Sequence, residues 1–265
     1  MSEIKGTNVV LHNKVALVTG ASRGIGRATA ERLARAGAKL VVTARTEAAL
    51  SETVAVINNN GGKAIAIACD GGDFNQVEAT VAQAKDAYGQ LDIVVNNAGT
   101  IEPISRLEEG GHEDWSQAVQ TNLLGVYYFI RAAVPSMIEQ GSGTIINLSS
   151  GAANSALEGW SAYCTTKAAV KKLTECAHKE LAGQGLRIVG LSPGTVSTGM
   201  MSRIKESGMN PVSQLDWSVH IPPEWAAEAV LYLCGSDSDA HLGTDFSIKT
   251  DEGRRAVGLP LQSER

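Results

Sequence analysis

Short apolar segments alternate with longer amphipathic segments along most of the chain. The apolar segments lack the strict alternation of half-exposed strands, which is typical of a parallel sheet covered on both faces. This pattern predicts strands at Val15–Thr19, Leu40–Thr43, Ala64–Cys69, Leu91–Asn96, Thr144–Ser149, Leu186–Ser192 and Asp245–Thr250. The amphipathic segments predict helices at about 24–36, 47–58, 73–88, 113–139, 161–182 and 223–234.

The alternation of strands and helices predicts an α/β fold with crossover helices. No linker or charge block divides the chain, so we expect a single domain over residues 14–265. Residues 1–13 resemble a loosely attached extension, and residues 197–222 lack clean periodicity and resemble a mobile flap over a substrate. The glycines expected to end helices are Gly37, Gly61, Gly62, Gly89, Gly141 and Gly183.

Composition narrows the class of protein. The chain has 265 residues, 43% of them apolar and 19% charged, which suits a compact soluble domain. A net charge of −5 argues against nucleic acid or an anionic membrane as the main partner. The sequence shows no signal peptide and no membrane span, so we expect a cytoplasmic protein.

Neither cysteine nor histidine has the spacing of a metal site. The cysteines have apolar flanks and are expected to be buried thiols in a reducing compartment: Cys69, Cys164, Cys176 and Cys234. The five histidines are scattered and are expected at the surface or at helix ends. We therefore predict no metal.

A glycine-rich loop follows the first predicted strand with the spacing G-x-x-x-G-x-G. Glycines permit a tight turn and a close approach to a diphosphate, which the start of the next helix stabilises. The alternative is an ordinary strand-to-helix turn. The residues expected to bind a dinucleotide are Gly20, Ser22, Arg23, Gly24, Ile25 and Gly26.

The end of the second predicted strand bears on cofactor choice. It carries Arg45 and no acidic residue, whereas a site for the non-phosphorylated dinucleotide usually has an acid there. Arg45 and Arg23 are candidates to bind a 2′-phosphate. Two charge-assisted hydrogen bonds of about 1.5–3 kcal/mol each would favour NADP(H) by about 100-fold or more. The alternative is that both arginines are merely solvated.

Tyr163 precedes Lys167 by four residues, which places both on one helix face. A nearby ammonium lowers the pKa of a phenol, and a tyrosine tuned in this way can transfer a proton near neutral pH. This spacing also occurs by chance, so the interpretation depends on the motifs that accompany it.

Together these motifs resemble the short-chain dehydrogenase/reductase family over about residues 13–252. The motifs appear in the order Gly20-x3-Gly24-x-Gly26, Asn96-Asn97-Ala98-Gly99, Asn122, Ser150, Tyr163-x3-Lys167 and Pro193-Gly194. The resemblance implies a Rossmann-type doubly wound three-layer sandwich with a seven-stranded parallel sheet. It also implies a nicotinamide cofactor at the carboxyl ends of the strands.

The resemblance further implies a role for each active-site residue. Tyr163 would be the general acid or base, and Lys167 would lower its pKa and bind the nicotinamide ribose. Ser150 would donate a hydrogen bond to the substrate oxygen. Asn122 would hold a water that relays protons between Lys167 and solvent.

Further cofactor contacts follow from the same resemblance. Asp70 would bind the adenine amino group, unless it is simply a helix cap. Gly71 departs from the apolar residue usual at that position. The residues expected to line the adenosine and the nicotinamide are Asn97, Ala98, Gly99, Pro193, Gly194, Val196 and Thr198.

Leu157, Trp160 and Met200 indicate an apolar substrate pocket beside Ser150 and Tyr163, although such side chains also fill cores or interfaces. We expect an NADP(H)-dependent oxidoreductase that interconverts a carbonyl compound and its alcohol. A 3-oxoacyl-thioester reductase ranks lower, because the helix ends expected to meet an acidic carrier protein lack basic residues. A non-catalytic NADP(H) sensor, or a dehydratase or epimerase, remains as an alternative. Family analogy favours a homotetramer or homodimer.

Overall fold

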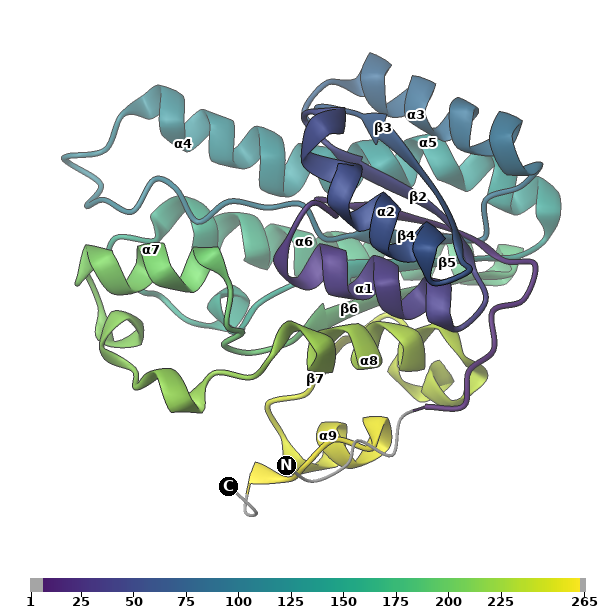
Figure 1. Cartoon of the computed structure of the whole chain (residues 1–265). Helices are drawn as coiled ribbons and strands as arrows, with labels where there is room; N and C mark the ends of the chain where they lie inside the picture. Colours follow the sequence, from purple (N-terminus) through teal and green to yellow (C-terminus); the bar gives the residue numbers. More distant parts are fainter. Residues whose placement is uncertain (1–6, 263–265) are drawn as a thin grey trace.

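The computed structural model describes residues 7–262 (Figure 1). Seven strands pair in parallel in the order β3-β2-β1-β4-β5-β6-β7. Their bounds are β1 Val15–Thr19, β2 Lys39–Ala44, β3 Lys63–Ala68, β4 Ile93–Asn96, β5 Gly143–Leu148, β6 Leu186–Ser192 and β7 Asp245–Ser247. The doubly wound α/β fold and its seven-stranded parallel sheet are confirmed.

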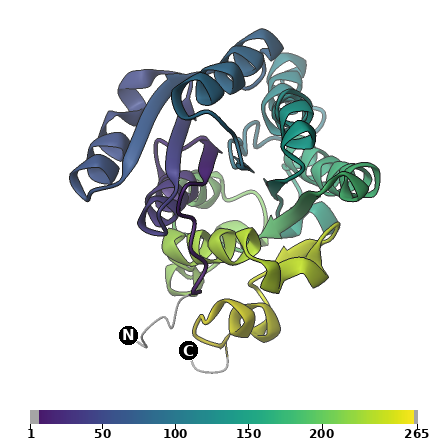
Figure 2. The same cartoon turned by 90° about the vertical axis from the view of Figure 1, so that its right-hand side faces the viewer.

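Helices cover both faces of the sheet (Figures 1 and 2). Their bounds are α1 Gly24–Arg35, α2 Ser51–Asn59, α3 Phe74–Tyr88, α4 His112–Val119, α5 Gly125–Gln140, α6 Ser161–Leu181, α7 Gly199–Ser207, α8 Pro223–Cys234 and α9 Asp251–Val257. One face packs against α1, α2 and α8, and the other packs against α3, α5 and α6. No helix within residues 7–262 combines the length and apolar character of a membrane span.

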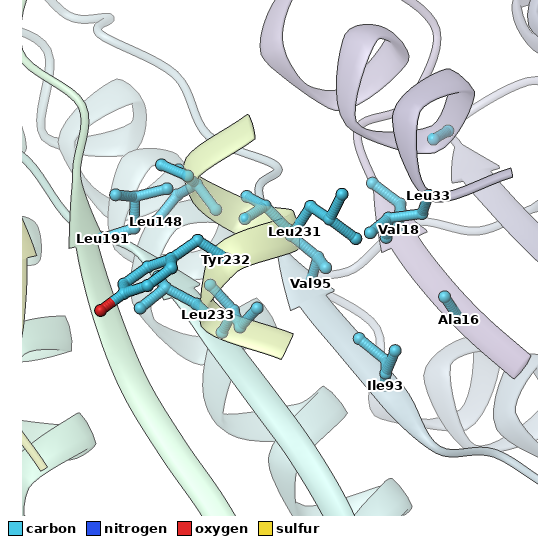
Figure 3. Packing of buried hydrophobic residues seen from close by; sticks show 14 of the residues in the cluster. Ala16, Val18, Leu33, Ile93, Val95, Leu148, Leu191, Leu231, Tyr232 and Leu233 are labelled. Atoms are coloured by element: carbon cyan, nitrogen blue, oxygen red, sulfur yellow. The ribbon is translucent and has the colours of Figure 1, made fainter. Parts of the chain in front are cut away.

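The two faces bury separate apolar cores. Side chains of α1, α8 and the strands meet in one of them (Figure 3), where Leu33, Leu231 and Leu233 are fully buried. Alternate residues of each strand enter opposite cores, because successive side chains point to opposite faces. In β5, Ile146 and Leu148 enter the core below α8, whereas Ile145 enters the core below α6.

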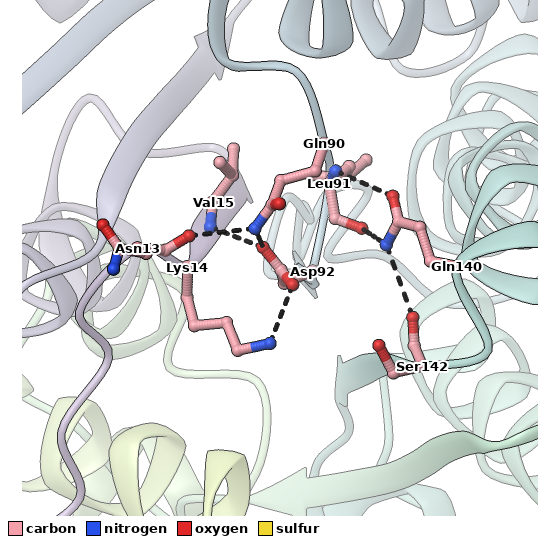
Figure 4. A network of polar contacts seen from close by, with 8 residues as sticks. All are labelled: Asn13, Lys14, Val15, Gln90, Leu91, Asp92, Gln140 and Ser142. Atoms are coloured by element: carbon pink, nitrogen blue, oxygen red, sulfur yellow. Dashed lines mark hydrogen bonds and ion pairs between the residues drawn. The ribbon is translucent and has the colours of Figure 1, made fainter.

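A polar network fixes the amino ends of the central strands (Figure 4). Asp92, just before β4, accepts hydrogen bonds from the backbone N–H of Val15 at 2.8 Å and from Lys14 Nζ at 2.9 Å. The side chain of Gln90 also donates to Asp92, at 2.6 Å. These contacts tie β1 to β4, and the strand order reverses between these two strands. In such folds, ligands bind outside the carboxyl ends of the strands at this switch point.

Three helical features differ from the sequence prediction. The helix predicted over residues 113–139 is α4 and α5 joined by a π-helical turn, Gln120–Leu124. The segment predicted as an aperiodic flap contains α7, which buries Met201 and Ile204 one turn apart. The tail after the last strand forms α9, which no pattern predicted.

Several expectations about individual residues were wrong. Of the expected extension, residues 1–6 lie outside the described residues, but Leu11 is buried and its backbone N–H donates to the carbonyl of Ala36. The left-handed residue after α6 is Gly185 rather than Gly183, because a short 3₁₀ turn intervenes. Cys176 is exposed rather than buried. His220 is buried and its ring stacks on Trp217.

Candidate active site

The loop between β1 and α1 forms a tight cradle. Gly20 and Gly24 have φ values of +64° and +57°, which side chains disfavour. A Cβ on Gly26 would lie only 2.3 Å from the carbonyl oxygen of Gly20. Arg23 caps α1 without a side-chain hydrogen bond, and the first turn has no acidic residue. The first backbone N–H groups of α1 therefore remain available to an anionic group, and the cradle fits a dinucleotide diphosphate.

The loop after β4 is bonded directly to this cradle. Asn97 Nδ2 donates to the carbonyl of Thr19 at 2.8 Å, and Thr19 Oγ1 accepts from the backbone N–H groups of Asn97 and Ala98. A Cβ on Gly20 would lie 2.9 Å from Ala98 Cα. Asn97 and Ala98 thus lie at the switch point, where the sequence places them, and the Asn97 amide shapes the glycine loop.

Arg23 and Arg45 lie in the loops that follow β1 and β2. The backbone N–H of Ala21 donates to the carbonyl of Thr43, so the two loops lie side by side. Both side chains are exposed, and neither has a hydrogen bond or ion pair with any residue in 7–262. Two unpaired guanidinium groups at this edge suit a phosphate.

Asp70 lies at the carboxyl end of β3 and is exposed. The cap of α3 is Asp73, whose carboxylate accepts from the backbone N–H groups of Asn75 and Gln76. Asp70 Oδ1 instead accepts from the backbone N–H of Gly72 at 3.0 Å. Asp70 is therefore not the helix cap, and Gly71 lies beside it within this turn.

The π-helical turn carries Asn122, which is fully buried. Asn122 Oδ1 accepts from the backbone N–H of Thr100 at 2.7 Å, and Nδ2 donates to the Thr100 carbonyl and to Thr166 Oγ1. Such turns often mark functional sites. Here the amide ties the loop after β4 to α6, and the water-holding role of Asn122 stays a prediction.

Ser150 and Tyr163 face each other. Ser150 begins the short 3₁₀ turn after β5, and its hydroxyl also accepts from the backbone N–H of Ala152 at 3.2 Å. Tyr163 lies in the first turn of α6 and is 8% exposed. Burial raises the pKa of Tyr163, and a hydrogen-bonding interaction with Ser150 partly lowers it. Ser149 is buried, and the serine that interacts with Tyr163 is Ser150.

Lys167 completes the group from the next turn of α6. Its Nζ lies 5.7 Å from the centre of the Tyr163 ring and donates to the Leu148 carbonyl at 2.6 Å. A Cβ on Gly99 would lie 3.8 Å from this Nζ and 3.3 Å from Asn122 Oδ1. The structure thus brings Asn122, Tyr163 and Lys167 together beside Gly99.

The expected electrostatic tuning of Tyr163 was wrong. Its pKa is raised by burial, and Lys167 is not among the groups that lower it. Burial lowers the pKa of Lys167 itself to about 8, opposed by the charge of Asp245. The spacing of the two residues correctly predicts their proximity, but it does not reveal how strongly both are desolvated.

The segment after β6 returns to the glycine loop. A Cβ on Gly24 would lie 3.3 Å from Thr198 Cγ2, so Thr198 borders the cradle. Val196 is 4% exposed and its side chain packs in the core below α8, which leaves only its backbone for a cofactor. Gly194 follows Pro193 with a φ of +86°.

The sequence analysis identified no charged group near Gly194, but the structure places Lys249 beside it. A Cβ on Gly194 would lie 2.8 Å from Lys249 Cγ, and a Cβ on Gly151 would lie 3.8 Å from its Nζ. Lys249 is more than fifty positions from either glycine in the chain, so no local motif connects them. The only feature of the sequence that could have indicated this placement is the position of Lys249 near the end of the last predicted strand.

The predicted substrate residues share one small apolar cluster with Tyr163. It combines Ile101, Ala152, Trp160, Met201 and Ile204 with the half-buried Ile104, Leu157, Cys164, Met200 and Val212. Trp160 is 4% exposed and packs edge-on against the Tyr163 ring at 5.7 Å. Trp160 therefore supports the tyrosine, whereas Leu157 and Met200 retain exposed surface.

Comparison with known proteins identifies the family. The model of short chain dehydrogenases matches residues 14–208. The chain belongs to the short-chain dehydrogenase family: it is an oxidoreductase that acts between CH–OH and C=O groups with a nicotinamide cofactor. Among residues 7–262, no three His, Cys, Asp or Glu side chains are placed to hold a metal ion.

Individual relatives cover nearly the whole chain. The 3-oxoacyl-[acyl-carrier-protein] reductase of a Synechocystis species is 35% identical over 238 residues, which span 89% of this chain and 95% of the relative. A xylitol dehydrogenase with bound NAD⁺ has a TM-score of 0.84 and 26% identity, over 90% of this chain and 98% of its own. An actinorhodin polyketide ketoreductase with NADPH has a TM-score of 0.82 and 30% identity, over 89% of this chain and 95% of its own.

Proposed function

We propose that this protein uses NADP(H) to interconvert a carbonyl compound and its alcohol, with Tyr163 as the general acid or base. The observation that carries the proposal is the convergence of Ser150 and Lys167 on Tyr163 at the carboxyl ends of the strands. When bound, the cofactor supplies or accepts the hydride.

The residues divide the remaining tasks. Ser150 donates a hydrogen bond to the substrate oxygen and stabilises the negative charge that develops there. Tyr163 gives that oxygen a proton during reduction and removes it during oxidation. Because its pKa is raised, Tyr163 holds its proton at neutral pH, as an acid must. Lys167 places its ammonium 5.7 Å from the centre of the Tyr163 ring and offers a donor to the cofactor ribose. Asn122 holds the loop after β4, which borders Lys167.

The preference for NADP(H) rests on Arg23 and Arg45. Both side chains are exposed and unpaired within residues 7–262, on neighbouring loops after β1 and β2, where such folds bind the adenosine ribose. The substrate is a free, medium-sized carbonyl compound or alcohol, because the cluster beside Tyr163 is apolar. A second candidate, reduction of 3-oxoacyl thioesters, is favoured by the identity to the Synechocystis reductase.

Turnover assays test the proposal. Ketones, aldehydes and 3-oxo-thioesters are supplied with NADPH or NADH, and the loss of reduced-nicotinamide absorbance is followed. Tyr163→Phe should lower turnover by about 100-fold or more. The control is Tyr127→Phe, which changes an exposed tyrosine on α5 and should have no effect. Near-normal turnover by Tyr163→Phe with intact cofactor binding contradicts the mechanism, and cofactor binding without turnover on every substrate favours the sensor alternative.

A further inference from the structure

Asp245 is a half-buried acid that the proposed mechanism does not use. It begins β7, where its neighbour Phe246 enters the core below α8. Successive strand residues point to opposite faces, so Asp245 faces α6, the helix that carries Tyr163 and Lys167. Across the sheet, Asp245 lies in register with Gly190 of β6, which lies in register with Asn147 of β5.

Gly190 makes room for the Asp245 carboxylate in this row. A Cβ on Gly190 would lie 2.7 Å from Asp245 Oδ1. Asn147 is occupied elsewhere, because its Nδ2 donates to Thr174 Oγ1 of α6 at 2.9 Å. Ser149 Oγ and Asp245 Oδ1 are both buried without a hydrogen-bond partner in residues 7–262. The carboxylate thus lies among polar groups between the sheet and α6, with bonding capacity to spare.

The charged groups that influence Asp245 come mainly from α6. Burial raises the pKa of Asp245, and the charge of Glu175 raises it further. The nearby Ser149 hydroxyl and the charges of Lys171 and Lys167 lower it. Lys171 Nζ is bound to Asn154 Oδ1 at 2.7 Å and is directed toward solvent. Lys167 is 5% exposed, and its Nζ has only the Leu148 carbonyl as a hydrogen-bond acceptor among the described residues. Asp245 lies on the same side of the sheet as Lys167, and its negative charge favours the Lys167 ammonium.

We propose that Asp245 is a positioning residue whose carboxylate keeps Lys167 in its ammonium form beside Tyr163. The inference rests on the proposed function, since it matters for the reaction only if Lys167 acts on Tyr163. Without Asp245, burial would favour the neutral amine, and the tyrosine would lose the adjacent positive charge at a lower pH. In this proposal Asp245 supports proton transfer through Lys167 and touches neither the substrate nor the cofactor.

The test follows the titration of Lys167 directly. In protein labelled with ¹³C-lysine and free of cofactor, the Cε resonance of Lys167 is identified by its absence in Lys167→Met. Asp245→Asn should lower the titration midpoint by about one unit, a tenfold change in the ammonium-to-amine ratio. The alkaline limb of the kcat/KM profile should move by the same amount, with little change at pH 6. A merely structural role would lower activity at all pH values equally.

Matched variants keep the test decisive. Glu175→Gln also removes one negative charge, from α6, the helix that carries Lys167. This variant should leave the titration midpoint of Lys167 unchanged. If Asp245→Asn does not fold, Asp245→Ser replaces it. If neither folds, the wild-type Lys167 resonance should show a second inflection as Asp245 titrates. An unshifted midpoint in a folded variant, or a single inflection in the wild type, overturns the proposal.

The outcomes separate the two proposals. A shifted Lys167 midpoint together with full activity of Tyr163→Phe would refute the proposed mechanism while leaving the effect of Asp245 on Lys167 intact. An unshifted midpoint together with an inactive Tyr163→Phe would refute the role of Asp245 alone.

Discussion

Replacing Lys167 by methionine should stabilise the folded protein at neutral pH although it removes activity. Lys167 is 5% exposed, and burial lowers its pKa from 10.5 to about 8. The folded state therefore binds the lysine proton less tightly than the unfolded state does, and at pH 7 the buried charge opposes folding. Methionine has a similar length and carries no charge.

The magnitude follows from the difference between the two pKa values. A lowering of about 2.5 units, at about 1.36 kcal/mol per unit, makes the charged lysine cost roughly 3 kcal/mol of folding free energy. This cost is fully present below pH 8 and disappears as the pH rises toward 10.5. The variant loses the hydrogen bond to the Leu148 carbonyl, which costs about 1 kcal/mol at every pH. Lys167→Met should thus be more stable by about 2 kcal/mol at pH 7 and less stable by about 1 kcal/mol near pH 11.

Urea unfolding at several pH values measures this change of sign, and Tm at pH 7 should rise by about 4–8 °C. Lys171→Met is the control, because Lys171 lies one turn further along α6 and its ammonium is exposed. It should change stability little and without dependence on pH. A Lys167→Met variant that is less stable at pH 7, or a stability difference that does not vary with pH, would refute the reasoning.

Three further substitutions test other parts of the structure. Arg45→Asp should move the ratio of kcat/KM for NADPH over NADH by about tenfold or more toward NADH, and an unchanged ratio contradicts the assignment. Gly26→Ala should raise the cofactor Kd at least about tenfold, because the added Cβ would displace the glycine loop. Fluorescence titration measures this Kd. The control is Gly183→Ala, because a Cβ at Gly183 contacts no other atom. Asp92→Ala should lower the free energy of unfolding by about 3 kcal/mol because two strand ends lose their shared acceptor, whereas Lys14→Met should cost about 1 kcal/mol or less. If urea unfolding shows equal losses of free energy for Asp92→Ala and Lys14→Met, the stabilisation comes from the surface ion pair between them and the reasoning is contradicted.

The sequence predicted the elements whose burial pattern is regular. The bounds of β1, β6 and α8 agree with the prediction, because the two strands are mostly apolar and the helix has clear start and stop signals. The helix α7 was missed because only two of its residues are buried, and α9 because it has seven residues and an internal glycine. The π-helical turn leaves no signature in hydrophobic periodicity.

The site was predictable where its residues form local motifs. The glycine loop and the tyrosine–lysine pair followed from spacing, and the choice of Ser150 followed from the family resemblance. The topology of the sheet then gathers these residues at the strand ends. Asp245 and Lys249 were missed because they reach the site only through the pairing of β7 with β6. The direction of the Tyr163 pKa was wrong because desolvation depends on the whole fold rather than on one helical turn.

The position of β7 has a consequence for assembly. This strand has three residues and lies at the edge of the sheet, so one of its sides is unpaired within the described chain. An edge strand is a natural docking place for a second subunit. Any subunit that docks there would exclude solvent from the surroundings of Asp245 and thereby change the charge balance at Lys167. Subunit association and proton transfer would then be linked through a single carboxylate.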